Sequence, residues 1–191
     1  MGYTLADFVA ELRGALAQGG PEAQCLAAGA SALRRLLAQP GALAPYRRAL
    51  DAGPGPWLLY QDPEFGFVVT LLRKPRGNTT PVHHHGEAWT LYGILEGEEV
   101  IHRYVRLDDR TRPGHAVIRR AEDHVRGPGE VEIEPPFAIH NETTSASRDT
   151  IAIAVRGRDL ATVQQEWFDL SSGTVTTAPG RAAAPLPPDL G

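Results

Sequence analysis

Two histidines, His83 and His85, stand two positions apart in the stretch TPVHHHGEAWT, which covers residues 80–90. On an extended strand the side chains alternate between the two faces, so this pair can reach one cation while His84 points away. Neutral imidazole is the commonest metal ligand among protein side chains. A His-x-His pair on a strand is also often solvated without any metal, so the pattern alone leaves both interpretations open.

Three further residues can take part in catalysis, and each has a plainer alternative. Glu87 shares the strand parity of the two histidines and is either a fourth ligand or acid–base group, or a solvated turn residue. Tyr92 either lines a pocket or packs as an ordinary strand aromatic. Arg156, like Arg73 and Arg103, either holds a carboxylate with two parallel hydrogen bonds or lies on the surface. We take Tyr92, Glu87 and Arg156 as the candidate catalytic residues.

The composition limits the class of protein. The chain has 191 residues, near the size of one domain, and a formal net charge of −4. This mildly acidic balance argues against a dedicated nucleic-acid binder, which normally presents a basic face. The single cysteine, Cys25, excludes an internal disulfide framework and a zinc site built from cysteines. We find no secretory signal and no apolar run of about 18 residues, so we expect a cytoplasmic protein without a membrane partner.

Residues 1–55 are predicted to form a helical segment that packs on the rest of the chain. Thr4 can cap a first helix, with Asp7 favouring its N-terminus. Apolar residues then repeat at helical spacing, at Leu5, Phe8, Val9, Leu12 and Leu16. Gly19, Gly20 and Pro21 end this helix, and a second helix is expected over residues 21–39.

Residues 56–170 change to short apolar runs separated by turns, which predicts β-structure. The runs are 57–60, 65–72, 89–95, 99–107, 116–120, 130–134 and 150–155. Gly and Pro make up 36 of the 191 residues, and clusters such as 127–129 mark the turns. Seven or so strands without intervening helices predict an all-β core, an antiparallel sandwich or barrel. Residues 171–191, rich in Ala and Pro, are expected to form an extended or poorly ordered tail.

The spacing of the histidines and nearby glycines resembles the two motifs of the cupin superfamily. The first runs from Gly77 over five residues to His83-x-His85, over four to Thr90 and over six to Gly97. The second runs from Gly129 over five residues to Pro135-Pro136-Phe137-Ala138-Ile139-His140, with Phe137 where a Gly is usual. The resemblance implies that His83, His85 and His140 bind one metal ion inside a cupin double-stranded β-helix, which is a jelly-roll barrel.

One departure from the cupin motif has a chemical consequence. Many cupins carry a Glu at the position of Thr90, and without that carboxylate the site has three neutral ligands. A divalent ion there keeps its full charge and about three open positions, which favours an anionic chelating substrate. Sites with three histidines resemble the thiol dioxygenase branch of the superfamily, with cysteine dioxygenase and 3-mercaptopropionate dioxygenase. That resemblance implies Fe(II), with Ni, Zn, Cu or Mn as alternatives, and the oxidation of a small thiol carboxylate by O2 to a sulfinate.

Other departures keep further functions open. The family has a Ser-His-Tyr alternation on a later strand, and here Ile151, Ile153 and Val155 stand in the corresponding positions. Residues 57–60 lack the Arg that holds the substrate carboxylate in cysteine dioxygenase. The alternatives are a redox-neutral metal-dependent lyase, isomerase or hydrolase, and a non-catalytic cupin that binds a small ligand. We expect a monomer or a homodimer.

Overall fold

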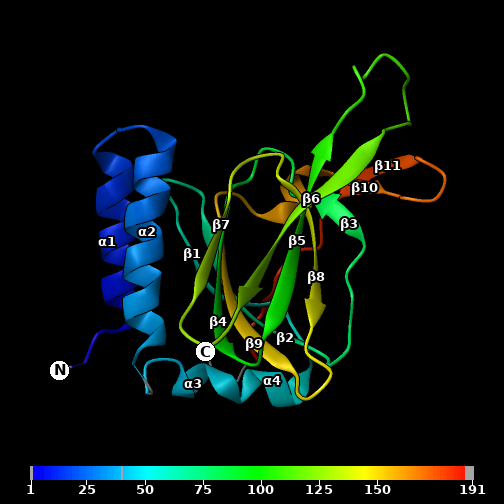
Figure 1. Cartoon of the computed structure of the whole chain (residues 1–191). Helices are drawn as coiled ribbons and strands as arrows, with labels where there is room; N and C mark the ends of the chain where they lie inside the picture. The colour runs from blue at the N-terminus through cyan, green and yellow to red at the C-terminus, as the bar shows by residue number, and fades with distance from the viewer. Residues whose placement is uncertain (1, 40, 188–191) are drawn as a thin grey trace.

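The computed structural model describes residues 2–39 and 41–187 (Figure 1). Helices α1 (Leu5–Ala17) and α2 (Glu22–Leu37) lie side by side, and the short helices α3 (Ala44–Arg47) and α4 (Ala49–Ala52) follow. The predicted cap is confirmed, because the Asp7 amide donates to Thr4 Oγ1 at 3.2 Å and the Thr4 amide donates to the Asp7 carboxylate at 2.8 Å. This reciprocal pair satisfies two amides that the helix itself leaves free.

Twelve strands follow within the described residues, and they form two six-stranded sheets. Their bounds are β1 Trp57–Gln61, β2 Val68–Lys74, β3 Val82–His84, β4 Thr90–Glu96, β5 Glu99–Arg106, β6 Ile118–Arg126, β7 Val131–Glu134, β8 Ile139–Thr144, β9 Thr150–Arg156, β10 Gln164–Phe168, β11 Val175–Pro179 and β12 Ala184–Pro185. A 3₁₀ turn, η1 (Leu160–Thr162), precedes β10. The sequence analysis did not predict β8, β10, β11 or β12 as strands.

The order of the strands identifies the architecture. One sheet has the order β12-β1-β2-β9-β4-β7 and the other β11-β10-β3-β8-β5-β6. The eight strands β2 to β9 thus divide into two facing antiparallel sheets with the order of a jelly roll, which is the fold of cupins. The fold class predicted from the sequence, a double-stranded β-helix with an N-terminal helical segment, is confirmed.

The sheet that contains β9 is buried on both faces, and this changes which residues point into the barrel. Ile151, Ile153 and Val155 pack outward in one apolar cluster with the residues of α1 and α2. Ala152 and Ala154 belong to a second cluster with Tyr92 and other residues of the barrel interior. The expectation that Ile151, Ile153 and Val155 correspond to the Ser-His-Tyr alternation is therefore wrong, because these residues face the helices. A strand covered by helices is apolar on both faces, so its hydrophobic pattern does not reveal its inner face.

The described residues after β10, which end at residue 187, run along the sheets, and residues 188–191 of the expected tail lie outside the described residues. Strand β11 pairs with β10, and β12 pairs in parallel with β1 at the edge of the other sheet. Within the described part of the chain, no helix is both long and apolar enough to cross a membrane.

Helix α2 approaches β4 closely at one glycine. A Cβ added at Gly93 would lie 2.7 Å from a methyl carbon of Leu37 and 3.1 Å from one of Leu33. Both leucines are buried in the cluster between the helices and the sheet. The absence of a side chain at Gly93 therefore allows α2 to cover the sheet.

We expect Gly93→Ala to lower the free energy of unfolding by about 1–3 kcal/mol, because the added methyl group overpacks this interface. Gly14→Ala is the matched control, since no atom lies within 4 Å of a Cβ at that helical position. It should raise the stability by about 0.5–1 kcal/mol through helix propensity. Urea denaturation measures both, and an unchanged or raised stability of Gly93→Ala would contradict the close approach.

Candidate metal centre

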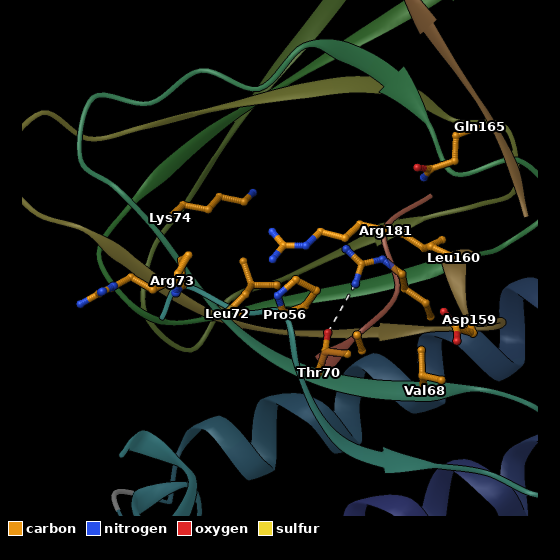
Figure 2. A pocket seen from close by; sticks show the side chains of 14 residues that line it. Pro56, Val68, Thr70, Leu72, Arg73, Lys74, Asp159, Leu160, Gln165 and Arg181 are labelled. Atoms are coloured by element: carbon orange, nitrogen blue, oxygen red, sulfur yellow. Dashed lines mark hydrogen bonds between the residues drawn. The ribbon is translucent and has the colours of Figure 1, made fainter. Parts of the chain in front are cut away.

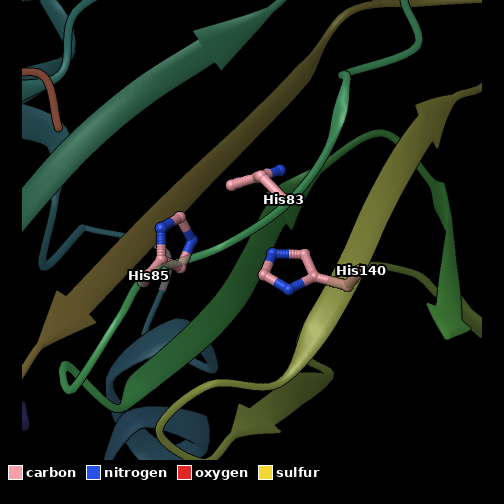
Figure 3. Close-up of side chains that lie close together, drawn as sticks. All are labelled: His83, His85 and His140. Carbon is pink, nitrogen blue, oxygen red and sulfur yellow. The ribbon is translucent and has the colours of Figure 1, made fainter. Parts of the chain in front are cut away.

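The three histidines named by the motifs converge inside the barrel (Figure 3). His83 lies on β3, His85 directly follows that strand, and His140 lies on β8 as the cross-strand partner of His83. One nitrogen atom from each ring lies within 4.8 Å of the others. The ring centroids are 4.7 Å apart for His83 and His85, 4.6 Å for His83 and His140, and 5.1 Å for His85 and His140. Such a group can hold one metal ion.

Backbone carbonyls orient two of the rings. His83 Nδ1 lies 2.9 Å from the carbonyl oxygen of Pro81, and His140 Nδ1 lies 2.9 Å from that of Ala138. Since a carbonyl only accepts, each Nδ1 carries the proton and each Nε2 presents its lone pair. On His85 the outer nitrogen, Nδ1, is contacted from β10 by the side-chain amide nitrogen of Gln165, which donates where the two carbonyls accept. A second group that holds the outer nitrogen is usual for metal-binding histidines.

Burial keeps these imidazoles neutral and therefore able to bind a cation. Desolvation lowers the pKa of His83 to about 4, and it also lowers the pKa of His85 and of His140. His140 Nε2 is shielded from solvent and has no hydrogen-bond partner. A buried nitrogen without a partner is costly, and a metal ion at this point removes the cost. The donor set thus fits a transition metal that prefers imidazole, such as Fe, Ni, Cu or Zn.

Two carboxylates reach the same place, which corrects the expectation of three neutral ligands alone. Glu134 Oε2 lies 3.2 Å from His140 Nε2 and 3.9 Å from His85 Nε2. Glu142 Oε1 lies 3.8 Å from His140 Nε2. Glu134, His140 and Glu142 form a second group that can hold a metal. A carboxylate that faces an imidazole lone pair at 3.2 Å requires a proton or a cation between them.

The two carboxyl groups are held in different electrostatic surroundings. Desolvation raises the pKa of Glu134 to about 7. Burial alone would also raise the pKa of Glu142, but Lys74 and the neighbouring histidines together hold it well below its ordinary value. Lys74 Nζ lies 3.2 Å from Glu142 and 3.1 Å from Glu99, and Thr80 donates a hydrogen bond of 2.5 Å to Glu142.

Sequence reasoning missed Glu134 because its signal depends on the pairing of distant strands. Glu134 is the direct cross-strand partner of Thr90 in the pairing of β7 with β4. A carboxylate thus lies on the neighbouring strand, directly opposite Thr90, the position at which many cupins carry a Glu. Glu142 lies on the same strand as His140, two residues further on. Its parity with His140 on one strand is a signal that the sequence does contain.

The structure places the three candidate catalytic residues differently. Tyr92 lies in the barrel, where its hydroxyl donates to Glu99 at 3.1 Å and its ring lies 4.5 Å from Lys74 Nζ. Desolvation raises its pKa, so the phenol is protonated. Tyr92 therefore reaches the histidines only through Lys74 and Glu142. Its role in catalysis stays a prediction.

Glu87 lies on the surface rather than with the histidines. Its side chain is 58% exposed, and its carboxylate lies 3.6 Å from Arg158. These are the surroundings of a solvated residue, which is the plainer of the two interpretations given for Glu87. Among the described residues, no group that could hold a metal includes Glu87.

Arg156 faces the barrel interior with Ala152 and Ala154, because residues at even positions of β9 point inward. Its Nη1 donates to Thr70 Oγ1 at 3.4 Å, while its Nε is buried without a partner. The charge of Arg156 contributes to the lowered pKa of His85, so the two groups are close enough to interact. Arg103 and Arg73, the other arginines considered, instead pair with Glu132 and Asp149.

A cavity of about 280 Å³ adjoins the histidines (Figure 2). Its wall includes Arg156, Lys74 and Gln165, and each of these has an interaction with a residue of the metal group. The three histidines do not themselves line it. The cavity is thus separated from the imidazoles by one layer of polar side chains.

No protein-family model matches the chain, and no curated protein matches it. Similar solved structures include the cupin domain of Cnp3 from Schizosaccharomyces pombe, at 14% identity and a TM-score of 0.40 over 53% of this chain and 59% of that one. An oxalate oxidase in complex with glycolate matches at 17% identity and a TM-score of 0.39, over 49% and 42%. The DMSP lyase DddQ from Ruegeria pomeroyi DSS-3 matches at 22% identity and a TM-score of 0.35, over 52% and 42%.

The match spans less than two thirds of the length of each of these three proteins. The strand order of the barrel, and not these similarities, carries the assignment of the fold.

Phe137 occupies the position where the cupin motif usually has glycine, and its backbone shows why. Its φ is 61°, in the left-handed region that a Cβ disfavours. The ring is 55% exposed and contacts His84, with centroids 5.5 Å apart. The Phe137 amide donates to the carbonyl of Gly86 at 2.7 Å, which holds this turn against the loop after His85.

We expect Phe137→Gly to be more stable than Phe137→Ala by about 1 kcal/mol. Both substitutions remove the ring, but only glycine also removes the Cβ that strains the backbone. The free energies of unfolding of the two variants, measured under identical conditions, give the comparison. Equal stabilities would show that the turn carries no strain at this position.

We expect Glu134→Gln to lower the affinity for a divalent transition metal about 10–100-fold, because it removes the negative charge beside His140. His140→Ala should abolish stoichiometric binding. Equilibrium dialysis with elemental analysis measures both.

Glu87→Gln is the matched control and should bind metal like the parent protein, since this carboxylate lies on the surface. Full metal content in His140→Ala, or equal losses in Glu87→Gln and Glu134→Gln, would contradict the site.

Proposed function

We propose that the protein is a mononuclear Fe(II) dioxygenase that oxidises a small thiol carboxylate to a sulfinate with O2. The observation that carries the proposal is the position of Arg156. This guanidinium forms no ion pair within the described residues and lies on the inner face of the barrel, close enough to His85 to influence its pKa. A site that pairs three imidazoles with an available guanidinium suits a substrate with one group for the metal and one carboxylate.

His83, His85 and His140 would hold the iron through their Nε2 atoms, with Glu134 or Glu142 beside them. Bound iron would supply the one-electron and oxygen chemistry that amino-acid side chains cannot perform. Arg156 would bind the substrate carboxylate through two parallel hydrogen bonds and so set the direction of the thiol. Glu134 is placed to accept the proton that the thiol releases, since its carboxylate lies between His140 and His85.

The inner face of β9 supports a substrate pocket that differs from that of the family. Ala152, Ala154 and Arg156 occupy the inward positions where the resemblance implies a Ser-His-Tyr alternation. The two alanines bring small apolar side chains, and Arg156 brings a cation where the family carries a phenol. The hydroxyl of Tyr92 is bound to Glu99, so this residue does not replace the absent tyrosine directly.

One observation favours a second candidate, a redox-neutral metal-dependent lyase, isomerase or hydrolase. Two buried carboxylates lie within 4 Å of a ligand nitrogen, and such a group can act as a general base on a substrate bound at the metal. This reaction would proceed without O2 and also with zinc in the site.

The test is oxygen uptake by protein that has been reconstituted anaerobically with Fe(II). We expect uptake and sulfinate formation with cysteine, 3-mercaptopropionate or mercaptosuccinate. Cysteamine, a thiol without a carboxylate, should react poorly. Arg156→Gln should raise KM for the reacting carboxylate thiol about 10–100-fold, because this factor corresponds to the free energy of one hydrogen bond to a charged group. The rate with cysteamine should not change.

His140→Ala serves as the blank that removes the metal. The absence of uptake with all four thiols, in protein shown to contain iron, would refute the dioxygenase and leave the second candidate. A loss in Arg156→Gln that is equal for cysteamine and the carboxylate thiols would show that Arg156 does not bind the carboxylate.

A further inference from the structure

The cavity beside the metal group is unusually cationic. Its lining includes Arg73, Lys74, Arg156 and Arg181, together with Asp159 as the one carboxylate among the described lining residues. Two of the cations are neutralised by neighbours. Arg73 lies 3.9 Å from Asp149, and Lys74 lies between Glu99 and Glu142. In Figure 2 the guanidinium of Arg73 points away from the cavity.

The other two cations form no close ion pair among the described residues, although the charges of Glu134 and Glu142 act on Arg156. Among the described residues, no carboxylate forms an ion pair with Arg156 or with Arg181. The Nε atom of Arg156 is buried without any hydrogen-bond partner. Figure 2 shows the guanidinium of Arg181 directed into the cavity, toward the side where Lys74 lies. The cavity therefore presents two guanidinium groups that lack a close ion pair.

Asp159 does not cancel this charge at close range. Its side chain accepts a hydrogen bond of 3.0 Å from the amide of Ala161 and caps the turn η1. An anion in the cavity is thus met by two guanidinium groups, while the one carboxylate of the lining is engaged by the backbone.

Arg181 is held in place although it lies in a connecting segment. The Gly180 amide donates to the carbonyl of Leu160 at 2.9 Å, just before Arg181. The Ala184 amide donates to the carbonyl of Pro56 at 2.8 Å, and Ala184 pairs with Trp57 in the parallel ladder of β12 and β1. The segment between these two anchors is short, so the backbone at Arg181 stays at the cavity.

We propose that this cavity binds a small dicarboxylate, with one carboxylate at Arg156 and the other at Arg181. The inference rests on the proposed function for the identity of the substrate, which becomes a thiol with two carboxylates rather than one. Each guanidinium offers a planar pair of donors that matches one carboxylate. A cavity of about 280 Å³ has room for a molecule of this size.

The test compares succinate with butyrate, which have the same number of carbon atoms but two carboxylates and one. Isothermal titration calorimetry gives both dissociation constants, for metal-loaded protein and for protein treated with a chelator. We expect succinate to bind about tenfold or more tightly than butyrate, since a charged hydrogen bond contributes at least this factor. The preference should persist after chelation, because the arginines and not the metal carry it.

Two variants locate the second carboxylate. Arg181→Gln should remove the preference for succinate and leave butyrate binding unchanged. Arg73→Gln, the matched control on the same wall, should retain the preference because Arg73 is paired and points away. Equal affinities for succinate and butyrate in the parent protein would overturn the proposal. So would a preference that survives in Arg181→Gln.

The result is independent of the proposed reaction. A preference for succinate without oxygen uptake on any thiol would keep the dicarboxylate site and refute the dioxygenase. Sulfinate formation without a preference for succinate would keep the dioxygenase and overturn the dicarboxylate site.

Discussion

Two carboxylates, Glu134 and Glu142, lie within 4 Å of one imidazole nitrogen inside the barrel, and the rest of the site depends on how their charge is balanced. Buried carboxylates are stable only with compensating positive charge or protons. Lys74 stabilises the ionised form of Glu142, and burial favours the protonated form of Glu134 in the absence of a metal. A cation among the three histidines would replace that proton. The polar interior is thus built around a position that requires positive charge.

The two sheets bring this group together because their strand order alternates. His83 and His140 come from neighbouring strands of one sheet, whereas Glu134 and Arg156 come from the facing sheet. Thr90 lies between Glu134 and Arg156 as the cross-strand partner of both. The helices on the outside allow the interior to be polar, since the apolar core lies between them and the sheet.

The histidines could be predicted from the sequence because their signal is local. The parity of His83 and His85 needs only a strand, and the spacing to His140 follows the cupin motifs. The start of the first helix could be predicted for the same reason, since Thr4 and Asp7 form a capping box within four residues. Glu134 could not be found in this way, because its proximity to the histidines depends on β7 pairing with β4. The inward face of β9 was misread because helices cover its other face, so both faces are apolar.

Arg181 reaches the cavity from a segment that contributes little to the packed core. The barrel, the helices and the metal group all precede it in the chain, and backbone hydrogen bonds on either side hold it in place. Changes of side chain in this segment can therefore alter the charge of the cavity without disturbing the folding of the barrel. Part of the positive charge of the cavity is thus encoded outside the stretch of sequence that forms the packed core. Proteins that share this barrel could then diverge in the ligands they accept through a few residues after β11.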